Sequence, residues 1–259
     1  MNRREFLWAA TLFGGVNARP GARSQSLTAD GWRVLEVTTH VHVQNASGVT
    51  RAWLPTPLVG SAYQQTLGDT YHAEGGTALM VENDQLDLLY AEWPAGVAPI
   101  LTLTSRVATR EHAVDLASRR GSADLEQARA IYDHAFGSVH RAQDDGPNPL
   151  VVALARAAGL RARVVYGLRL LSHASRAQHC RAEVSIDGLG WVPIDAADRL
   201  FGLWDGRWIG FNAAHDVRLP RAAGGTVAVF TRPQAETANG RADSLDPDTF
   251  RYDITVREL

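Results

Sequence analysis

The alternation of apolar and polar positions predicts an all-β region in the first part of the chain. From Trp32 to about Arg110, short runs rich in Val, Leu, Ile and aromatic residues are separated by turns of Gly, Pro and Asn. The predicted strands cover residues 34–43, 51–54, 78–81, 86–93 and 100–107. Pro55 and Pro57 follow the second run and should end it. This spacing favours a small sandwich or an open sheet.

The middle of the chain has the period of two helices. Ser122 can cap the first, whose apolar residues are three and four positions apart: Leu125, Ala128, Ile131, Tyr132, Ala135 and Phe136. A polar segment over residues 141–150 follows, and Gly146, Pro147 and Pro149 interrupt it. We expect Asn148 to cap the second helix, with Pro149 at its first position and Gly159 at its end.

Two kinds of strand pattern follow the helices. Residues 163–171 (RVVYGLRLL) form a nearly continuous apolar run, which is typical of a strand buried on both faces. Residues 179–198 then alternate on either side of Gly188 and Gly190, which predicts a hairpin. Beyond it, Trp204, Trp208 and Phe211 are expected in packing, and the C-terminal residues as a closing strand.

The predicted hairpin carries a His and an Asp that could meet. His179 lies on its first strand and Asp195 near the end of its second, so a turn near Leu189 brings them within a few residues of each other. A carboxylate that holds a His fixes its tautomer and stabilises the imidazolium, which is the orienting half of a nucleophilic triad. The alternative is a structural hydrogen bond that keeps the hairpin in register.

Composition narrows the classes of function. The chain has 259 residues, 45% of them hydrophobic and 21% charged, as in ordinary globular proteins. A net charge of −2 without a basic stripe argues against a nucleic-acid partner. The single Cys excludes an internal disulfide and a Cys-rich zinc site.

The N-terminus looks like an export signal. Arg3 and Arg4 precede Phe6, Leu7 and a short apolar run, a pattern that resembles signals of the bacterial twin-arginine pathway. We expect residues 1–30 to be signal peptide and linker, and the protein to be periplasmic or secreted. Membrane contact is then limited to this segment before its cleavage; an uncleaved anchor is the alternative.

The helix, apolar strand and hairpin together are similar to the core of the bacterial transglutaminase-like proteins, which share the papain-like cysteine-protease fold. The likeness rests on ALARAAGLRARVVYGLRL and HCRAEVSIDGLGWVPIDAADR. It implies an α+β fold: an N-terminal antiparallel β domain (residues 31–115), then a core (residues 116–259) with helices packed on an antiparallel sheet and a C-terminal strand extension.

The resemblance also implies site residues. In that family a Cys at a helix N-terminus attacks an amide or ester carbonyl, a His on the following hairpin is its base, and an Asp orients the His. His179 matches the base and Asp195 the orienting acid. Aligning the second helix, however, places Asp144 at the position of the Cys. No metal or cofactor is implied.

The sequence offers other candidate nucleophiles near His179. Cys180 adjoins His179 on a strand, so its side chain should face the opposite way and be a small buried thiol. A carboxylate nucleophile at Asp144 would give an anhydride, a poor match to a His base. Ser172 or Ser175, in the link before the hairpin, could approach His179, but neither would start from a helix N-terminus.

Metal binding is a further alternative at two places. His40 and His42 share a strand face, but no third ligand pattern accompanies them. His179, Asp195, Asp144 and Asp145 offer one imidazole and three carboxylates, although their spacing is not a known ligand pattern.

Three hypotheses follow from the sequence. The leading one is a transglutaminase-like protein of the cell envelope that lacks its nucleophile and acts as a binding or structural module for a protein or peptide. The second is an active hydrolase or acyltransferase of peptide amides that uses His179 and Asp195 with an unidentified nucleophile. The third is a metal or small-molecule binder. Cell-wall peptides and periplasmic proteins fit the compartment.

Overall fold

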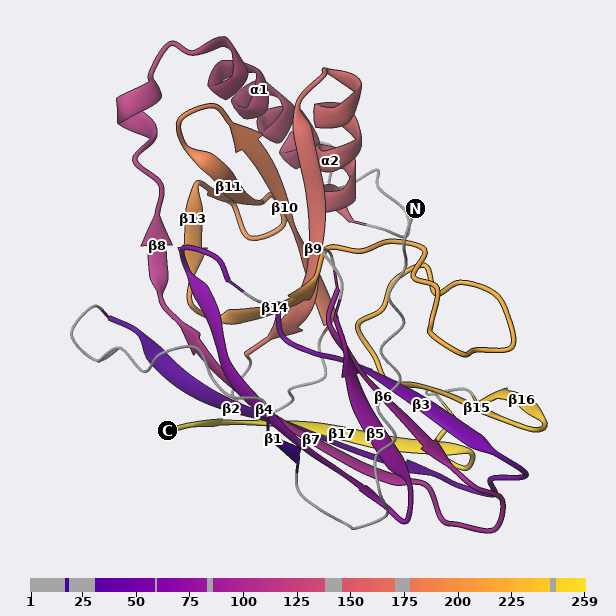
Figure 1. Cartoon of the computed structure of the whole chain (residues 1–259). Coiled ribbons are helices and arrows are strands. Elements are labelled where there is room, and N and C mark those ends of the chain that lie inside the picture. The colour runs from indigo at the N-terminus through magenta and orange to yellow at the C-terminus, as the bar shows by residue number, and fades with distance from the viewer. Residues whose placement is uncertain are drawn as a thin grey trace, which may run out of the picture.

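The protein has an α+β fold whose sheets are all antiparallel. The computed structural model describes residues 17–18, 31–58, 60–82, 86–137, 146–170, 178–242 and 246–259. In this part of the chain, two sheets form a lower body and a third sheet with two helices lies above it (Figure 1).

The lower body is a sandwich of two five-stranded sheets. The first contains, in spatial order, β1 (Asn17–Ala18), β4 (Gln64–Glu74), β7 (Ile100–Thr109), β2 (Arg33–Val43) and β17 (Phe250–Glu258). The second contains β16 (Gly240–Ala242), β15 (Gln234–Thr237), β3 (Thr50–Pro55), β6 (Leu88–Trp93) and β5 (Thr77–Val81). Side chains from both inner faces, among them Val41, Leu54, Trp93 and Leu101, form one buried cluster. Of the two arrangements that the sequence allows, a sandwich and an open sheet, the structure has the sandwich.

The sandwich combines strands from the two ends of the sequence. β17 pairs with β2 from Phe250↔Val43 to Glu258↔Leu35, and β15 pairs with β3. The strands after residue 233 thus complete the sheets of the N-terminal strands. The expected β domain of residues 31–115 covers only part of these sheets, and its boundary stays a prediction.

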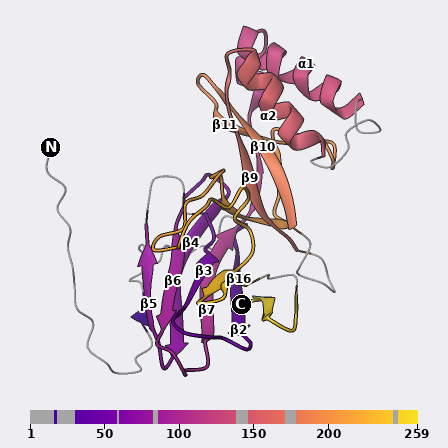
Figure 2. The same ribbon diagram turned by 90° about the vertical axis from the view of Figure 1, so that its right-hand side faces the viewer.

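The upper sheet carries both helices on one face (Figure 2). Its order is β12 (Leu200–Phe201), β11 (Gly190–Asp195), β10 (Gln178–Ile186), β9 (Arg161–Arg169) and β14 (Trp208–Asn212). The helices are α1 (Ala123–Gly137) and α2 (Pro147–Ala157), preceded by the short 3₁₀ helix η2 (Leu116–Arg119). A separate two-stranded ladder joins β8 (Glu111–Ala113) to β13 (Leu203–Asp205).

The predicted hairpin is present as β10 and β11, with Ile186 opposite Gly190 and Ala182 opposite Ile194. Because side chains alternate along a strand, Ala182, Val184 and Ile186 pack against the helices. His179 and Arg181 lie on the other face. That face is closed by aromatic residues of β13 and β14, so the site lies away from the helical layer.

Helix α2 begins earlier than the sequence suggests. Its N-cap is Gly146, and Pro147 is its first residue. The prediction that Asn148 caps this helix is therefore wrong: Asn148 belongs to the first turn. In the described part of the chain, its side chain does not bond to the helix backbone and can contact the hairpin of β10 and β11.

The sandwich and the upper sheet share a buried layer. Leu35, Val107 and Ile254 of the sandwich pack with Leu168 and Ile209 of β9 and β14. The side chain of Gln64 adds two hydrogen bonds, donating to the carbonyl of Gly210 (2.8 Å) and accepting from its N–H (2.9 Å). These contacts hold β14 against β4.

Among the described residues, no helix has the length and apolar character needed to cross a membrane.

We predict that Gly167→Ala strongly destabilises the upper sheet. Gly167 pairs with Gly210, and a Cβ there would meet the carbonyl oxygen of Ile209 and lie 2.9 Å from the Gly210 Cα. Because backbone atoms of β14 would have to move, the free energy of unfolding should fall by about 2 kcal/mol. Denaturant unfolding measures this. Gly224→Ala is the control, since a Cβ there meets nothing within 4 Å; equal loss in both variants would contradict the prediction.

Candidate functional site

The centre of the site is a hydrogen-bonded pair of His179 and Asp195. The Nε2 atom of His179 lies 2.7 Å from Oδ2 of Asp195. The His side chain is 16% exposed and that of Asp195 is fully buried. The hairpin positions both groups: Ala182 lies opposite Ile194, so the next residue of β11, Asp195, lies beside Arg181, which shares a strand face with His179. The proximity predicted from the sequence is confirmed.

The buried carboxylate of Asp195 is fully hydrogen-bonded. Its Oδ1 accepts from the side-chain amide of Asn148 (2.9 Å) and from the backbone N–H groups of Ala197 (3.1 Å) and Asp198 (3.2 Å). Its Oδ2 accepts from Arg181 Nε (3.0 Å) as well as from His179. Five donors therefore fix the orientation of this carboxylate.

Asn148 links the helical layer to this carboxylate. Besides its bond to Asp195, its amide nitrogen donates to the carbonyl of Cys180 (2.8 Å) and its oxygen accepts from the N–H of Ala196 (2.8 Å). The first turn of α2 is thus bound to both strands of the hairpin, and Asn148 is itself 2% exposed.

These contacts keep Asp195 ionised. Burial alone would raise its pKa, but the hydrogen bonds from His179 and Asn148, together with the electrostatic effects of His179 and Arg181, outweigh burial. They lower the pKa of Asp195 from 3.8 to about 2.

The geometry also selects a tautomer of His179. Its Nε2 atom lies near both the Asp195 carboxylate and NH2 of Arg169 (3.2 Å). One ring nitrogen cannot donate and accept at once, and an ionised carboxylate can only accept. Nε2 therefore carries the hydrogen, and Nδ1 is the nitrogen that remains for proton transfer or for a ligand. Trp208 packs edge-on against the ring, at 6.5 Å between centroids.

Arg181 is a buried cation behind the pair. Its side chain is 2% exposed and forms ion pairs with Asp195 and, through NH2, with Asp205 (3.0 Å). The guanidinium also lies 5.1 Å from the ring of Trp204 and 5.3 Å from that of Trp208. Aromatic faces and two carboxylates thus stabilise a charge that burial would otherwise penalise.

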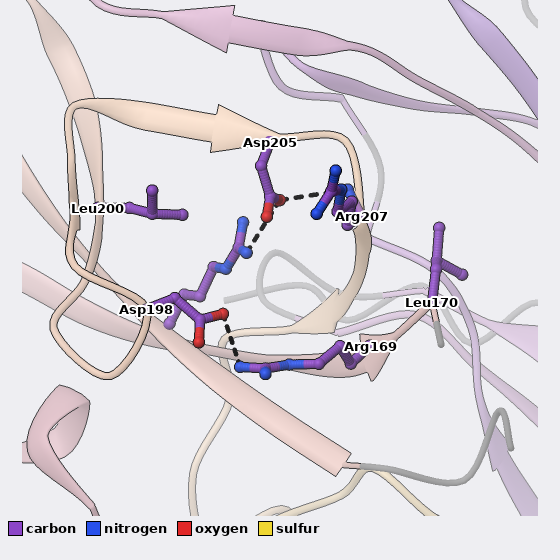
Figure 3. A pocket seen from close by; sticks show the side chains of 7 residues that line it. Arg169, Leu170, Asp198, Leu200, Asp205 and Arg207 are labelled. Carbon is purple, nitrogen blue, oxygen red and sulfur yellow. Dashed lines mark hydrogen bonds and ion pairs between the residues drawn. The ribbon is translucent and has the colours of Figure 1, made fainter. Parts of the chain in front are cut away.

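A pocket of about 460 Å³ opens beside these groups. It is lined by Arg169, Leu170, Arg181, Asp198, Leu200, Asp205 and Arg207 (Figure 3). Within this lining Arg169 pairs with Asp198 at 2.7 Å, and the same guanidinium contacts His179. Arg169 and Arg181 therefore line the pocket and also contact the His–Asp pair, whose own two residues are not part of the lining.

Comparison with known proteins shows what the sequence and the fold of this chain are similar to. Residues 140–196 match the model of the Transglutaminase-like superfamily. The chain contains a transglutaminase-like domain. A crystal structure of a candidate cysteine protease from Cytophaga hutchinsonii has a TM-score of 0.50 and 14% sequence identity, over 88% of this chain and 91% of that one. At this identity the likeness concerns the fold alone.

A relative from Haemophilus influenzae, an uncharacterised protein, is 33% identical over 43% of this chain. The match spans 42% of that protein's length.

The nucleophile of the transglutaminase-like domain is not found among the described residues. Asp144, Asp145, Ser172 and Ser175 all lie outside them. Cys180, the only cysteine of the chain, is half-buried rather than buried as we predicted. It follows His179 on β10, and strand alternation turns its side chain to the face on which the helices pack.

The carboxylates beside His179 are already bound by arginines, which disfavours a metal ion there. His179, Asp195 and Asp198 offer ligand atoms within 4.8 Å of one another. Arg181 and Arg169 already hold the two carboxylates, so a divalent ion would have to displace two guanidinium groups. At the other place considered for a metal, His40 is exposed and its Nδ1 contacts Thr102 Oγ1 at 3.0 Å.

Sequence reasoning missed most neighbours of the His–Asp pair. Arg181 was detectable, because it lies two residues after His179 and so shares its strand face. Asn148 was interpreted as a helix cap. Arg169 and Asp205 lie on other strands, and only the sheet order brings them to the site.

We predict that Asp195 contributes to stability in a pH-dependent way. Its pKa in the folded protein is below the usual 3.8, so its contribution is present above pH 3.8 and is lost as the pH falls toward 2. The loss over this interval should be on the order of 2 kcal/mol. Urea unfolding between these pH values measures it, and Asp195→Asn should remove this part of the decline. An unchanged decline in the variant would contradict the assignment.

Proposed function

We propose that the transglutaminase-like domain is a binding module for peptides or proteins that does not use thiol chemistry. One observation carries the proposal: the only cysteine of the chain is Cys180, on the opposite strand face from His179. Thiol-dependent acyl transfer needs a thiolate that faces its base. Neighbouring residues on one extended strand cannot provide this arrangement.

The retained His–Asp pair fits a binding role. The five donors to Asp195 connect α2, β10 and the end of β11, so they stabilise one rigid wall of the site. On that wall, Nδ1 of His179 and the guanidinium of Arg169 are polar groups that a ligand can contact. A pre-formed cleft with a few fixed polar groups is typical of ligand sites.

Catalysis through another nucleophile is the second candidate, and the state of Asp195 favours it. An ionised carboxylate on Nε2 stabilises an imidazolium and so prepares Nδ1 to accept a proton. Asp144, Ser172 and Ser175 are the groups that such a mechanism would have to use. A hydrolase or acyltransferase of peptide amides would follow from it.

We further propose that the protein acts in the cell envelope after export. The support is the Arg3–Arg4 pair before a short apolar run at the N-terminus. A peptide or protein of that compartment is then the expected partner.

The first experiment separates binding from catalysis. The purified protein and His179→Ala should show the same background rates with a nitrophenyl ester, with a fluorescent casein, and in amine incorporation into casein. Alkylation by iodoacetamide should change none of these rates. A hydrolysis or transfer rate that His179→Ala abolishes would overturn the binding-only proposal; Asp144→Ala, Ser172→Ala and Ser175→Ala would then identify the nucleophile.

The second experiment tests export. Replacement of both Arg3 and Arg4 by Lys should retain the protein in the cytoplasm of a bacterial host with a functional twin-arginine pathway. Cell fractionation and immunoblotting measure the distribution. Arg23→Lys is the control, since it leaves the arginine pair intact. Equal export of both variants would contradict the proposal.

A further inference from the structure

The pocket beside the His–Asp pair has the chemistry of a carboxylate site. Three of its seven lining residues are arginines (Arg169, Arg181 and Arg207), and two are aspartates. We infer that it binds a single carboxylate group of a peptide ligand. This inference deepens the proposed function, because it names the group that the binding module would recognise.

Arg181 supplies the observation that points to a ligand. Its Nε and NH2 atoms are bound to Asp195 and Asp205, but its buried NH1 has no hydrogen-bond partner within the described ranges. A buried donor without a partner is costly, since it has lost its contacts with water. The same side chain lines the pocket, so a small shift on binding would let a carboxylate oxygen reach this guanidinium.

Arg207 supplies a cation that the pocket does not neutralise. The carboxylates of Asp198 and Asp205 are paired with Arg169 and Arg181. Arg207 is exposed, and the part of the chain that the structure describes forms no ion pair with its side chain. Guanidinium groups bind carboxylates through paired N–H donors, which makes arginine the usual choice for such recognition.

The balance of charges favours a monoanion. Arg181 is paired with two carboxylates, Asp195 and Asp205, and Arg169 with Asp198. The one guanidinium in the lining without a carboxylate partner among the described residues is that of Arg207, and a single carboxylate would balance its charge. A doubly charged phosphate would be repelled by Asp198 and Asp205. The repulsion is weaker for a singly charged carboxylate, which is therefore the favoured anion.

Leu170 and Leu200 indicate that the part of the ligand next to its carboxylate is apolar. They provide apolar walls in a pocket of about 460 Å³, which is large enough for an amino-acid side chain next to the charged group. Two sources share this chemistry: the C-terminal carboxylate of a peptide with an aliphatic last residue, and the side chain of Asp or Glu within a peptide.

Calorimetric titration of the full chain tests the inference with three defined probes. They are N-acetyl-alanyl-leucine, its C-terminal amide, and N-acetyl-glutamic acid α-amide. At least one carboxylate probe should bind about tenfold more tightly than the neutral amide, as expected for a charge-assisted hydrogen bond. Arg207→Gln should reduce this preference severalfold. Arg218→Gln, an exposed arginine outside the pocket, should leave it unchanged.

The probes also separate the possible outcomes. Tighter binding of N-acetyl-alanyl-leucine alone identifies recognition of chain ends, and tighter binding of the glutamyl probe identifies recognition of acidic side chains. Equal affinity for acid and amide, preference for inorganic phosphate, no binding of any probe, or an Arg207→Gln variant identical to the unchanged protein would overturn the inference. The readout is binding, so turnover that depends on His179 would refute only the non-catalytic proposal.

Discussion

The buried negative charge of Asp195 is the constraint on which the site depends. An ionised carboxylate without contact to water costs several kcal/mol unless donors surround it, and here five donors from α2, β10 and the turn after β11 do so. Each donor is thereby fixed in position. The orientation of His179, the burial of Arg181 and the position of the first turn of α2 all follow from one requirement.

The alternation of apolar and polar residues predicted the strands that bury one face in a core. It missed strands that have few apolar residues. The alternation in β2 and the hairpin of β10 and β11 were predictable, because apolar residues mark their core faces. β4 was missed: its sequence QQTLGDTYHAE has few apolar residues, and most of its positions are half-buried or exposed. β14 was interpreted as packing, although it pairs with β9 and supports the site.

The site was predictable only where the hairpin alone defines it. His179 and Asp195 lie on adjoining strands, so their separation in sequence fixes their separation in space. Asn148 depends on the true start of α2, since a cap at that position would have turned its side chain to the helix backbone. Arg169 reaches the site through the pairing of β9 with β10, and Arg207 reaches it because β14 pairs with the other edge of β9. No short-range pattern encodes the second pairing.

The pairing of β17 with β2 has a consequence for how the protein folds. Arg33 and Glu258 form an ion pair across these strands although they are 225 positions apart in the chain. Contacts between such distant segments form slowly, because closing the long loop costs conformational entropy before the contacts stabilise the fold. During synthesis β2 has no partner on this side until β17 has emerged, so one edge of the sandwich stays open to wrong pairing. β2 therefore depends on β17, the last strand of the chain, for the protection of its edge.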